Sequence, residues 1–205
     1  MTEIPQTPDY PAAWGPPQTR TVTWFDPERL RAITAGLTGR ELIEGIIAGR
    51  IPPPPIASLV GTRLVSVADG EAVFRCLPDR STYNPVGMVH GGLLCTLLDS
   101  AMGVAVQSRL DPGVRSATIE LKVSFLRPVR DGGELEIHGR ALQIGRRVAF
   151  AEAHARDHEG ALVGHATSSL AVIGGGPTAP REDGRAAAKD GPAAAKDGPG
   201  AGAMA

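Results

Sequence analysis

The longest stretch of helical periodicity in the chain runs from about Val89 to Gln107. Its apolar residues recur three and four positions apart, which brings their side chains onto one face of an α-helix. These residues are Leu93, Leu94, Leu97, Leu98, Ala101, Met102 and Ala105. One carboxylate, Asp99, interrupts the run. The pattern predicts a long, largely buried helix that carries an acid part-way along its length.

Residues 56–174 otherwise follow the two-residue period of β-strands. The clearest alternation places Ala117, Ile119, Leu121, Val123 and Phe125 on one face and Thr118, Glu120, Lys122 and Ser124 on the other. Other strand candidates span 62–67, 71–77, 134–141, 147–156 and 161–173, and the first two flank Asp69-Gly70, a typical hairpin dipeptide. No helices recur between the strands, which excludes a doubly wound parallel sheet. We therefore expect an α+β fold, with a curved antiparallel sheet wrapped around one long central helix.

Composition divides the chain into three segments. Residues 1–55 contain two helix starts, Asp26-Pro27 and the capping-box pair Thr38 and Glu41, and end in a proline run that we expect to be an extended spacer. Residues 175–205 are low in complexity and cannot bury a core, so we expect a disordered tail. The expected organisation is a short helical N-terminal extension over 1–55, an α+β domain over 56–174 and the tail.

Charge and cysteine content argue against several classes of partner and site. The formal net charge of −1 argues against nucleic-acid and membrane-surface partners, both of which favour a basic excess. No apolar run approaches the ~18 residues of a transmembrane helix, and the first residues lack the pattern of a signal peptide. Cys76 and Cys95 are far apart, so we expect reduced, buried cysteines in a cytoplasmic protein. No third ligand accompanies His154 and His158, and we expect no metal site.

The segment before the long helix carries a candidate site. Asn84-Pro85 starts a turn, and His90 stands directly before Gly91 and Gly92. Because glycine has no Cβ, these two residues would let a ligand approach the free N–H groups at the positive end of the helix.

Asp99 has two interpretations. Removal from water makes a carboxylate a stronger base, which suits a nucleophile or general base. Alternatively, Asp99 belongs to an ordinary polar stripe that faces a partner subunit and consists of Thr96, Asp99, Ser100, Gly103 and Gln107. His90 and Asp99 lie about 13 Å apart along a helix and about half a turn around it. If both serve one site, that site should combine residues from two subunits.

The motif Asn84-Pro85-x-Gly87-x-x-His90-Gly91-Gly92, with an acid nine residues after the histidine, resembles that of the PaaI-like thioesterases of the hotdog fold. The resemblance continues through ATIELKVSFLRPV, with its closing Pro128, to about Ile173. It implies the same α+β architecture as the periodicity does. The short helical extension is similar to one found in some members.

The resemblance implies hydrolysis of an aryl- or fatty-acyl-CoA thioester to the free acid and CoA. In this family the N–H at the position of Gly91 polarises the thioester carbonyl. The acid that matches Asp99, supplied by the facing subunit, activates water or attacks the carbonyl directly. Asn84 and His90 would position the reacting groups, and Thr118 stands where some members carry a serine that orients the acid.

The resemblance also implies a homodimer or homotetramer with sites at the dimer interface, and no metal or redox cofactor. Gly92 is a further substrate-binding candidate, and Arg127, Arg146 and Arg147 near strand ends could contact CoA phosphates. These arginines could equally be solvated turn residues. Two other functions remain open: a hotdog protein that binds acyl-CoA without cleaving it, and a hotdog enoyl-CoA hydratase or dehydratase.

Overall fold

The structure, a computed structural model, describes residues 11–130 and 133–174. Its helices are α1 (Pro27–Ile33), α2 (Gly39–Ile47), α3 (Pro55–Val60) and α4 (Gly91–Gln107), with short 3₁₀ turns η1 (Ala12–Trp14) and η2 (Arg80–Thr82). Its strands are β1 (Thr62–Ala68), β2 (Glu71–Cys76), β3 (Arg115–Phe125), β4 (Leu135–Ile144), β5 (Val148–Arg156) and β6 (Leu162–Ile173). The tail expected over 175–205 lies outside the described residues.

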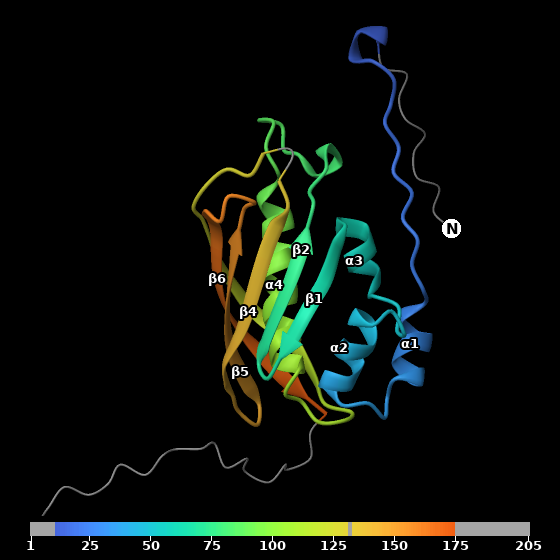
Figure 1. The fold of residues 1–205 in the computed structure, drawn as a ribbon, viewed down its shortest axis with the longest axis vertical. Coiled ribbons are helices and arrows are strands. Elements are labelled where there is room, and N and C mark those ends of the chain that lie inside the picture. The colour runs from blue at the N-terminus through green and yellow to red at the C-terminus, as the bar shows by residue number, and fades with distance from the viewer. Residues whose placement is uncertain (1–10, 131–132, 175–205) are drawn as a thin grey trace, which may run out of the picture.

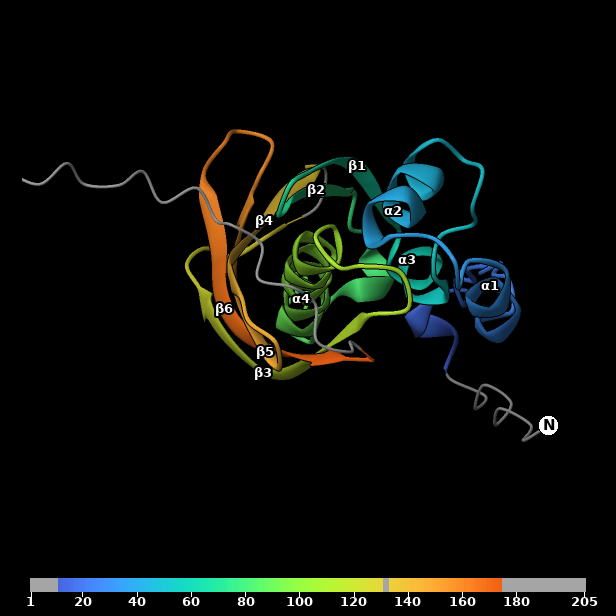
Figure 2. The same cartoon turned by 90° about the horizontal axis from the view of Figure 1, so that it is seen from below.

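The six strands form one antiparallel sheet in the order β1-β2-β4-β5-β6-β3. The sheet curves around α4, which lies inside the curve in Figure 2. Helices α1, α2 and α3 stand beside β1 rather than against the outer face of the sheet (Figure 1). The α+β architecture predicted from the periodicity is therefore confirmed.

The helix starts predicted in the N-terminal extension are confirmed. The Asp26 carboxylate accepts the Glu28 N–H at 2.8 Å and caps α1. Thr38 and Glu41 form a capping box at the start of α2. The proline run is not wholly extended, however, because α3 begins at its last residue, Pro55. Proline is accepted at a first helical position, where the missing N–H would have no partner within the helix.

Helix α4 approaches the sheet unusually closely. Its leucines and Met102 are fully or almost fully buried. Where β4 crosses the helix, the residue is Gly139, and a Cβ there would collide with the carbonyl group of Ala101. The absence of a side chain at Gly139 thus lets the backbones of β4 and α4 touch, and this contact fixes the depth of the helix in the sheet.

The strict alternation predicted for residues 117–125 is wrong at one position. The pairing of β3 with β6 shifts register between Thr118 and Glu120, so Ile119 is the extra residue of a β-bulge. Thr118 lies opposite Leu170 and Leu121 lies opposite Ser168, and both partners are buried. Thr118 and Leu121 therefore share the face toward α4, whereas the sequence pattern had put them on opposite faces.

Two further expectations concern the membrane and the cysteines. None of the helices in the described ranges is long and apolar enough to span a bilayer. Both cysteines are free. Cys76 is buried, and that burial raises the pKa of its thiol to about 11. Cys95 is only half-buried, because it lies on the side of α4 that the sheet does not cover completely, so the expectation that both are buried holds for Cys76 alone.

The contact at Gly139 generates a stability prediction. Gly139→Ala forces β4 away from α4, and overpacking of this kind costs about 1–3 kcal/mol. We expect the free energy of unfolding, measured by urea titration, to fall by that amount. Gly36→Ala is the control, because a Cβ there meets nothing within 4 Å. Unfolding of Gly139→Ala at the wild-type urea concentration would contradict the proposed packing constraint.

The outer face of the sheet generates a pH prediction. His138 and His154 stack with ring centroids 5.0 Å apart, and burial, followed by the neighbouring His138 charge, lowers the pKa of His154. Protons then bind the unfolded histidine more readily than the folded one, so stability falls as pH drops from the ordinary value toward the lowered one. We expect the denaturant midpoint of wild type to fall more between pH 7 and pH 5 than that of His154→Gln. An equal fall in the two proteins would contradict this prediction. The exposed His158→Gln should behave like wild type.

Candidate functional site

The start of α4 presents one available backbone donor. The His90 side chain caps the helix, with Nδ1 accepting the Gly92 N–H at 2.8 Å. The His90 N–H itself donates to the Thr82 carbonyl at 2.8 Å. No acceptor among the described residues takes the Gly91 N–H. The amide of Gly91, at the positive end of the helix, is therefore the donor left for a ligand, whereas that of Gly92 is engaged.

Asn84 shapes the loop that leads to the helix. Its Oδ1 accepts the N–H groups of Val86 and Met88, both at 3.1 Å, and its own N–H donates to the Met88 carbonyl at 2.8 Å. The side-chain oxygen is thus occupied by the turn, and the Nδ2 group takes no part in it. Asn84 consequently fixes the approach to His90 and Gly91.

Asp99 is held by a residue of β3. The Thr118 hydroxyl donates to Asp99 Oδ1 at 2.7 Å, and Asp99 is half-buried on α4. The bulge at Ile119 makes this bond possible, because it turns Thr118 toward the helix. One carboxylate oxygen is therefore oriented by the protein, and Oδ2 remains for other chemistry.

The predicted site residues lie in two groups, one around Gly91 and one around Asp99. The two residues are eight positions apart on α4, which corresponds to about 12 Å along the helix axis. A Cβ at Gly91 would lie 3.1 Å from the Phe125 ring, at the end of β3, whereas Asp99 meets Thr118 near the start of that strand. A single chain therefore does not bring the Gly91 amide and the Asp99 carboxylate together.

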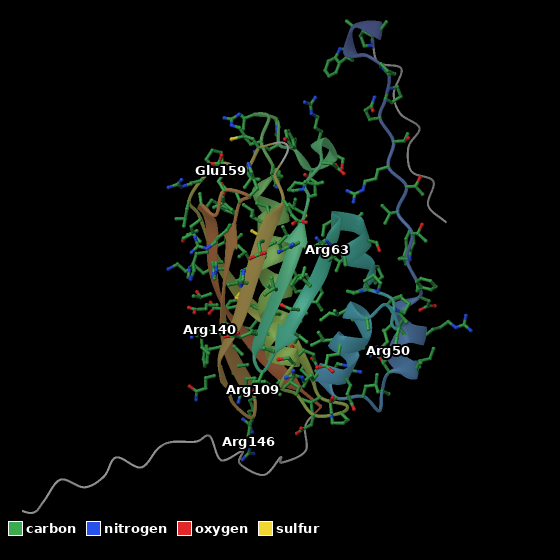
Figure 3. All side chains as sticks on the ribbon, viewed as in Figure 1. Arg50, Arg63, Arg109, Arg140, Arg146 and Glu159 are labelled. Carbon is green, nitrogen blue, oxygen red and sulfur yellow. The ribbon has the colours of Figure 1, made fainter. Side chains whose placement is uncertain are left out.

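The three arginines predicted to bind CoA lie at opposite ends of the sheet. All three are exposed. Arg127 follows β3 at the end of the sheet where α4 begins, and Arg146 and Arg147 form the β4–β5 turn at the opposite end, where Figure 3 labels Arg146. A smaller pocket near the start of α4, about 430 Å³ in volume, is lined by Arg80, Tyr83, Gly87 and Arg130. Arg80 precedes the recognisable motif, so nothing in the sequence pattern indicated a role for it.

A larger cavity of about 810 Å³ opens beside Asp99. Asp99 and Thr118 line one side, and residues of α2, α3 and the proline run line the other. Helix α2 presents to the cavity an apolar stripe that includes Ile46 and Ile47. Such a stripe is equally typical of ordinary helix packing, so the sequence did not reveal this cavity. Across the residues that the structure describes, no three His, Cys, Asp or Glu side chains converge in a way that could hold a metal ion.

Comparison with known proteins places these features in a family. The sequence profile of the thioesterase superfamily matches residues 86–163. A conserved protein of known structure from Pseudomonas aeruginosa is 35% identical, with a TM-score of 0.55, and the match covers 58% of this chain and 93% of that one. A hypothetical thioesterase from Streptococcus pneumoniae, solved with coenzyme A, is 27% identical with a TM-score of 0.52; the match covers 55% of this chain and 86% of that one.

Human acyl-coenzyme A thioesterase 13 is 30% identical over 89 residues, which is 42% of this chain and 61% of the human protein. The first curated relatives, from Halobacterium salinarum and Pseudomonas aeruginosa, are matched over 66% and 60% of their own lengths. The profile spans α4 and strands β3 to β5 and ends at the start of β6, and the solved Pseudomonas relative is covered almost completely. This chain belongs to the thioesterase superfamily and has its hotdog fold.

Proposed function

We propose that the protein is an acyl-CoA thioesterase, which hydrolyses an acyl-CoA to the free acid and CoA. The observation that carries the proposal is the Asp99 carboxylate, oriented by Thr118 and facing a large cavity in a chain of this superfamily. The similarity to human acyl-coenzyme A thioesterase 13 and the coenzyme A in the Streptococcus pneumoniae structure support it.

The Gly91 amide would stabilise the charge that develops during the reaction. When a nucleophile adds to a thioester, negative charge gathers on the carbonyl oxygen. An N–H at a helix start is already oriented toward such a charge, and one donor of this kind contributes about 10²–10³ in rate. His90 and Asn84 act as positioning residues, because one caps the helix and the other holds the preceding loop.

Asp99 would either activate the attacking water or attack the thioester carbonyl itself. As a general base, it removes a proton from water while the water oxygen bonds to the carbonyl carbon; the C–S bond then breaks and the CoA sulfur leaves as thiolate or, once protonated, thiol. As a nucleophile, it forms an acyl anhydride that water hydrolyses afterwards, with the same products. In both routes the Thr118 hydroxyl holds Oδ1, so that Oδ2 faces the substrate.

Pairing of two chains along β3 would unite the two groups of residues. β3 is an edge strand of the sheet and leaves Ile119 and Phe125 largely exposed, and a long edge of this kind needs a cover. An antiparallel pair that sets Thr118 opposite the partner subunit's Phe125 is centred between Leu121 and Lys122, close to the middle of the strand. Asp99 of one subunit then approaches the Gly91 amide of the other. The proposed unit is a homodimer, or a homotetramer of such dimers.

The same pairing suggests how CoA is held. Arg127 lies at the end of the sheet where α4 begins. An antiparallel partner turns its own β4–β5 turn, with Arg146 and Arg147, toward that end. Arginine suits phosphate because its guanidinium group is always charged and donates several hydrogen bonds. We therefore propose that these three arginines contact the phosphates of CoA from two subunits.

The first test is replacement of the acid. Asp99→Asn keeps the shape of the side chain and can still accept the Thr118 bond, but it cannot accept a proton, so we expect kcat/KM to fall by about 10²–10⁴. Thiol release from a panel of acyl-CoAs measures it. The exposed Glu71→Gln is the control, with wild-type activity expected.

Three other outcomes of this assay would contradict the proposal. Full activity in Asp99→Asn removes the acid from the mechanism. Binding of acyl-CoA to wild type without any thiol release indicates a binding protein. A change in double-bond absorbance without thiol release indicates a hydratase or dehydratase.

The second test concerns the shared site. Gly91→Pro deletes the N–H, and proline is accepted at a first helical position. In a mixed dimer of Asp99→Asn and Gly91→Pro chains, one of the two sites keeps both intact groups, because each site takes one group from each chain. We expect each variant alone to be nearly inactive and the re-associated mixture to recover activity. No recovery in dimers verified to be mixed would contradict a site built from two subunits.

A further inference from the structure

We propose that the N-terminal extension builds the pocket for the acyl chain, and that the protein therefore prefers thioesters of straight fatty-acyl chains over aryl thioesters. This inference rests on the proposed function, since it takes Asp99 as the reacting acid. It adds a substrate class and the residues that select it.

The cavity beside Asp99 has the size and lining of a ligand site. Its volume of about 810 Å³ falls within the ~300–1,000 Å³ of small-molecule pockets. The extension supplies an apolar wall made of Ile46, Ile47, Pro53 and Pro54, and Ile56 continues this wall directly after the extension. Ile47 and Ile56 are 38% and 43% exposed although they are large and apolar. An apolar ligand that covers them would gain from their removal from water.

Several polar groups that line the cavity are already bonded within the protein. Gln107 donates to the Val114 carbonyl at 3.0 Å and accepts the Ser116 N–H at 3.2 Å. Ser100 donates to the Thr96 carbonyl at 2.7 Å. Arg63, a further lining residue, is paired with Glu134 at 3.0 Å. A hydroxylated aryl group would find few partners here, whereas an alkyl chain needs none.

The wall is anchored to the rest of the fold. The Gly39 N–H at the start of α2 donates to the Leu110 carbonyl at 3.1 Å, just beyond the end of α4. A Cβ at Gly39 would collide with the Gln107 carbonyl, so the two backbones touch. Ile43 is 2% exposed. Helix α2 is therefore fixed against α4 and keeps the cavity open, as a preformed pocket requires.

This wall belongs to the part of the chain outside the family match. The superfamily profile begins at residue 86, whereas the wall lies within residues 46–56. The solved Pseudomonas relative is covered over 93% of its length by only 58% of this chain. The pocket wall thus lies outside the profile match, and it is a place where the specificity of this chain would differ from that of relatives without such an extension.

Gly103 allows the pocket to be filled without strain. It lies one helical turn beyond Asp99 and lines the cavity, and a Cβ there meets nothing within 4 Å. Gly103→Leu therefore occupies the cavity with a residue that favours helix. Gly36→Leu is the matched control, because a Cβ at Gly36 is equally unobstructed and Gly36 is absent from the cavity lining.

Ile47 tests the extension itself. Ile47→Asp places a charge on the pocket wall at a position that is already partly exposed, so the fold should tolerate it. Ile33→Asp is the matched control: Ile33 lies on α1, is 79% exposed and is not part of the cavity lining. Both variants and both controls are made in the full chain.

The measurement is kcat/KM for straight acyl-CoAs from butanoyl to dodecanoyl and for phenylacetyl-CoA. For wild type and the two controls we expect a rise of about three- to fourfold per methylene until the cavity is filled, with phenylacetyl-CoA below the longer chains. Gly103→Leu and Ile47→Asp should lower the decanoyl-to-butanoyl ratio at least tenfold. Hydrolysis with an unchanged ratio in both variants, or wild-type preference for phenylacetyl-CoA, would overturn the inference and leave the thioesterase proposal standing.

A second readout separates the two proposals. If wild type releases no thiol from any substrate, the proposed function fails, and binding of dodecanoyl-CoA by calorimetry then tests the pocket on its own. Weaker binding to Ile47→Asp than to Ile33→Asp would support the acyl pocket. Equal binding to both would overturn it.

Discussion

The contact between the backbones of α4 and β4 at Gly139 determines how the rest of the molecule is arranged. Because no side chain separates Ala101 from the strand, the helix lies deep in the curved sheet and buries its leucines. Its rotation is fixed by the same contact. The polar side of α4, which carries Asp99, therefore faces β3 and the N-terminal extension. There Thr118 donates a hydrogen bond to Asp99, and the cavity opens beside the carboxylate.

The geometry of α4 separates the two chemical functions of the proposed site. The helix start offers an amide, and the carboxylate lies about 12 Å further along the axis. This distance is too large for both to act on one carbonyl group in a single chain. The free edge of β3 offers the means to unite them, because an antiparallel copy reverses the order of the two groups. Assembly and chemistry are thus linked in the proposed enzyme.

Sequence periodicity predicted α4, the strands and the caps of α1 and α2, since these depend on local patterns of apolar and capping residues. It failed where long-range pairing decides the outcome. The bulge at Ile119 comes from the register between β3 and β6, and it reverses the face of Thr118. The cavity depends on how α2 docks on α4, so the stripe that contains Ile46 and Ile47 could not by itself indicate whether it met protein or ligand.

The most direct measurement is a crystal structure of the protein with a decanoyl-CoA analogue in which a ketone replaces the thioester. We predict that the ketone oxygen lies within hydrogen-bond distance of the Gly91 N–H, that the partner subunit's Asp99 faces the carbonyl carbon, and that the alkyl chain occupies the cavity between α2 and α4. A lone subunit, or a ketone remote from either the Gly91 amide or an Asp99 carboxylate, would contradict the account.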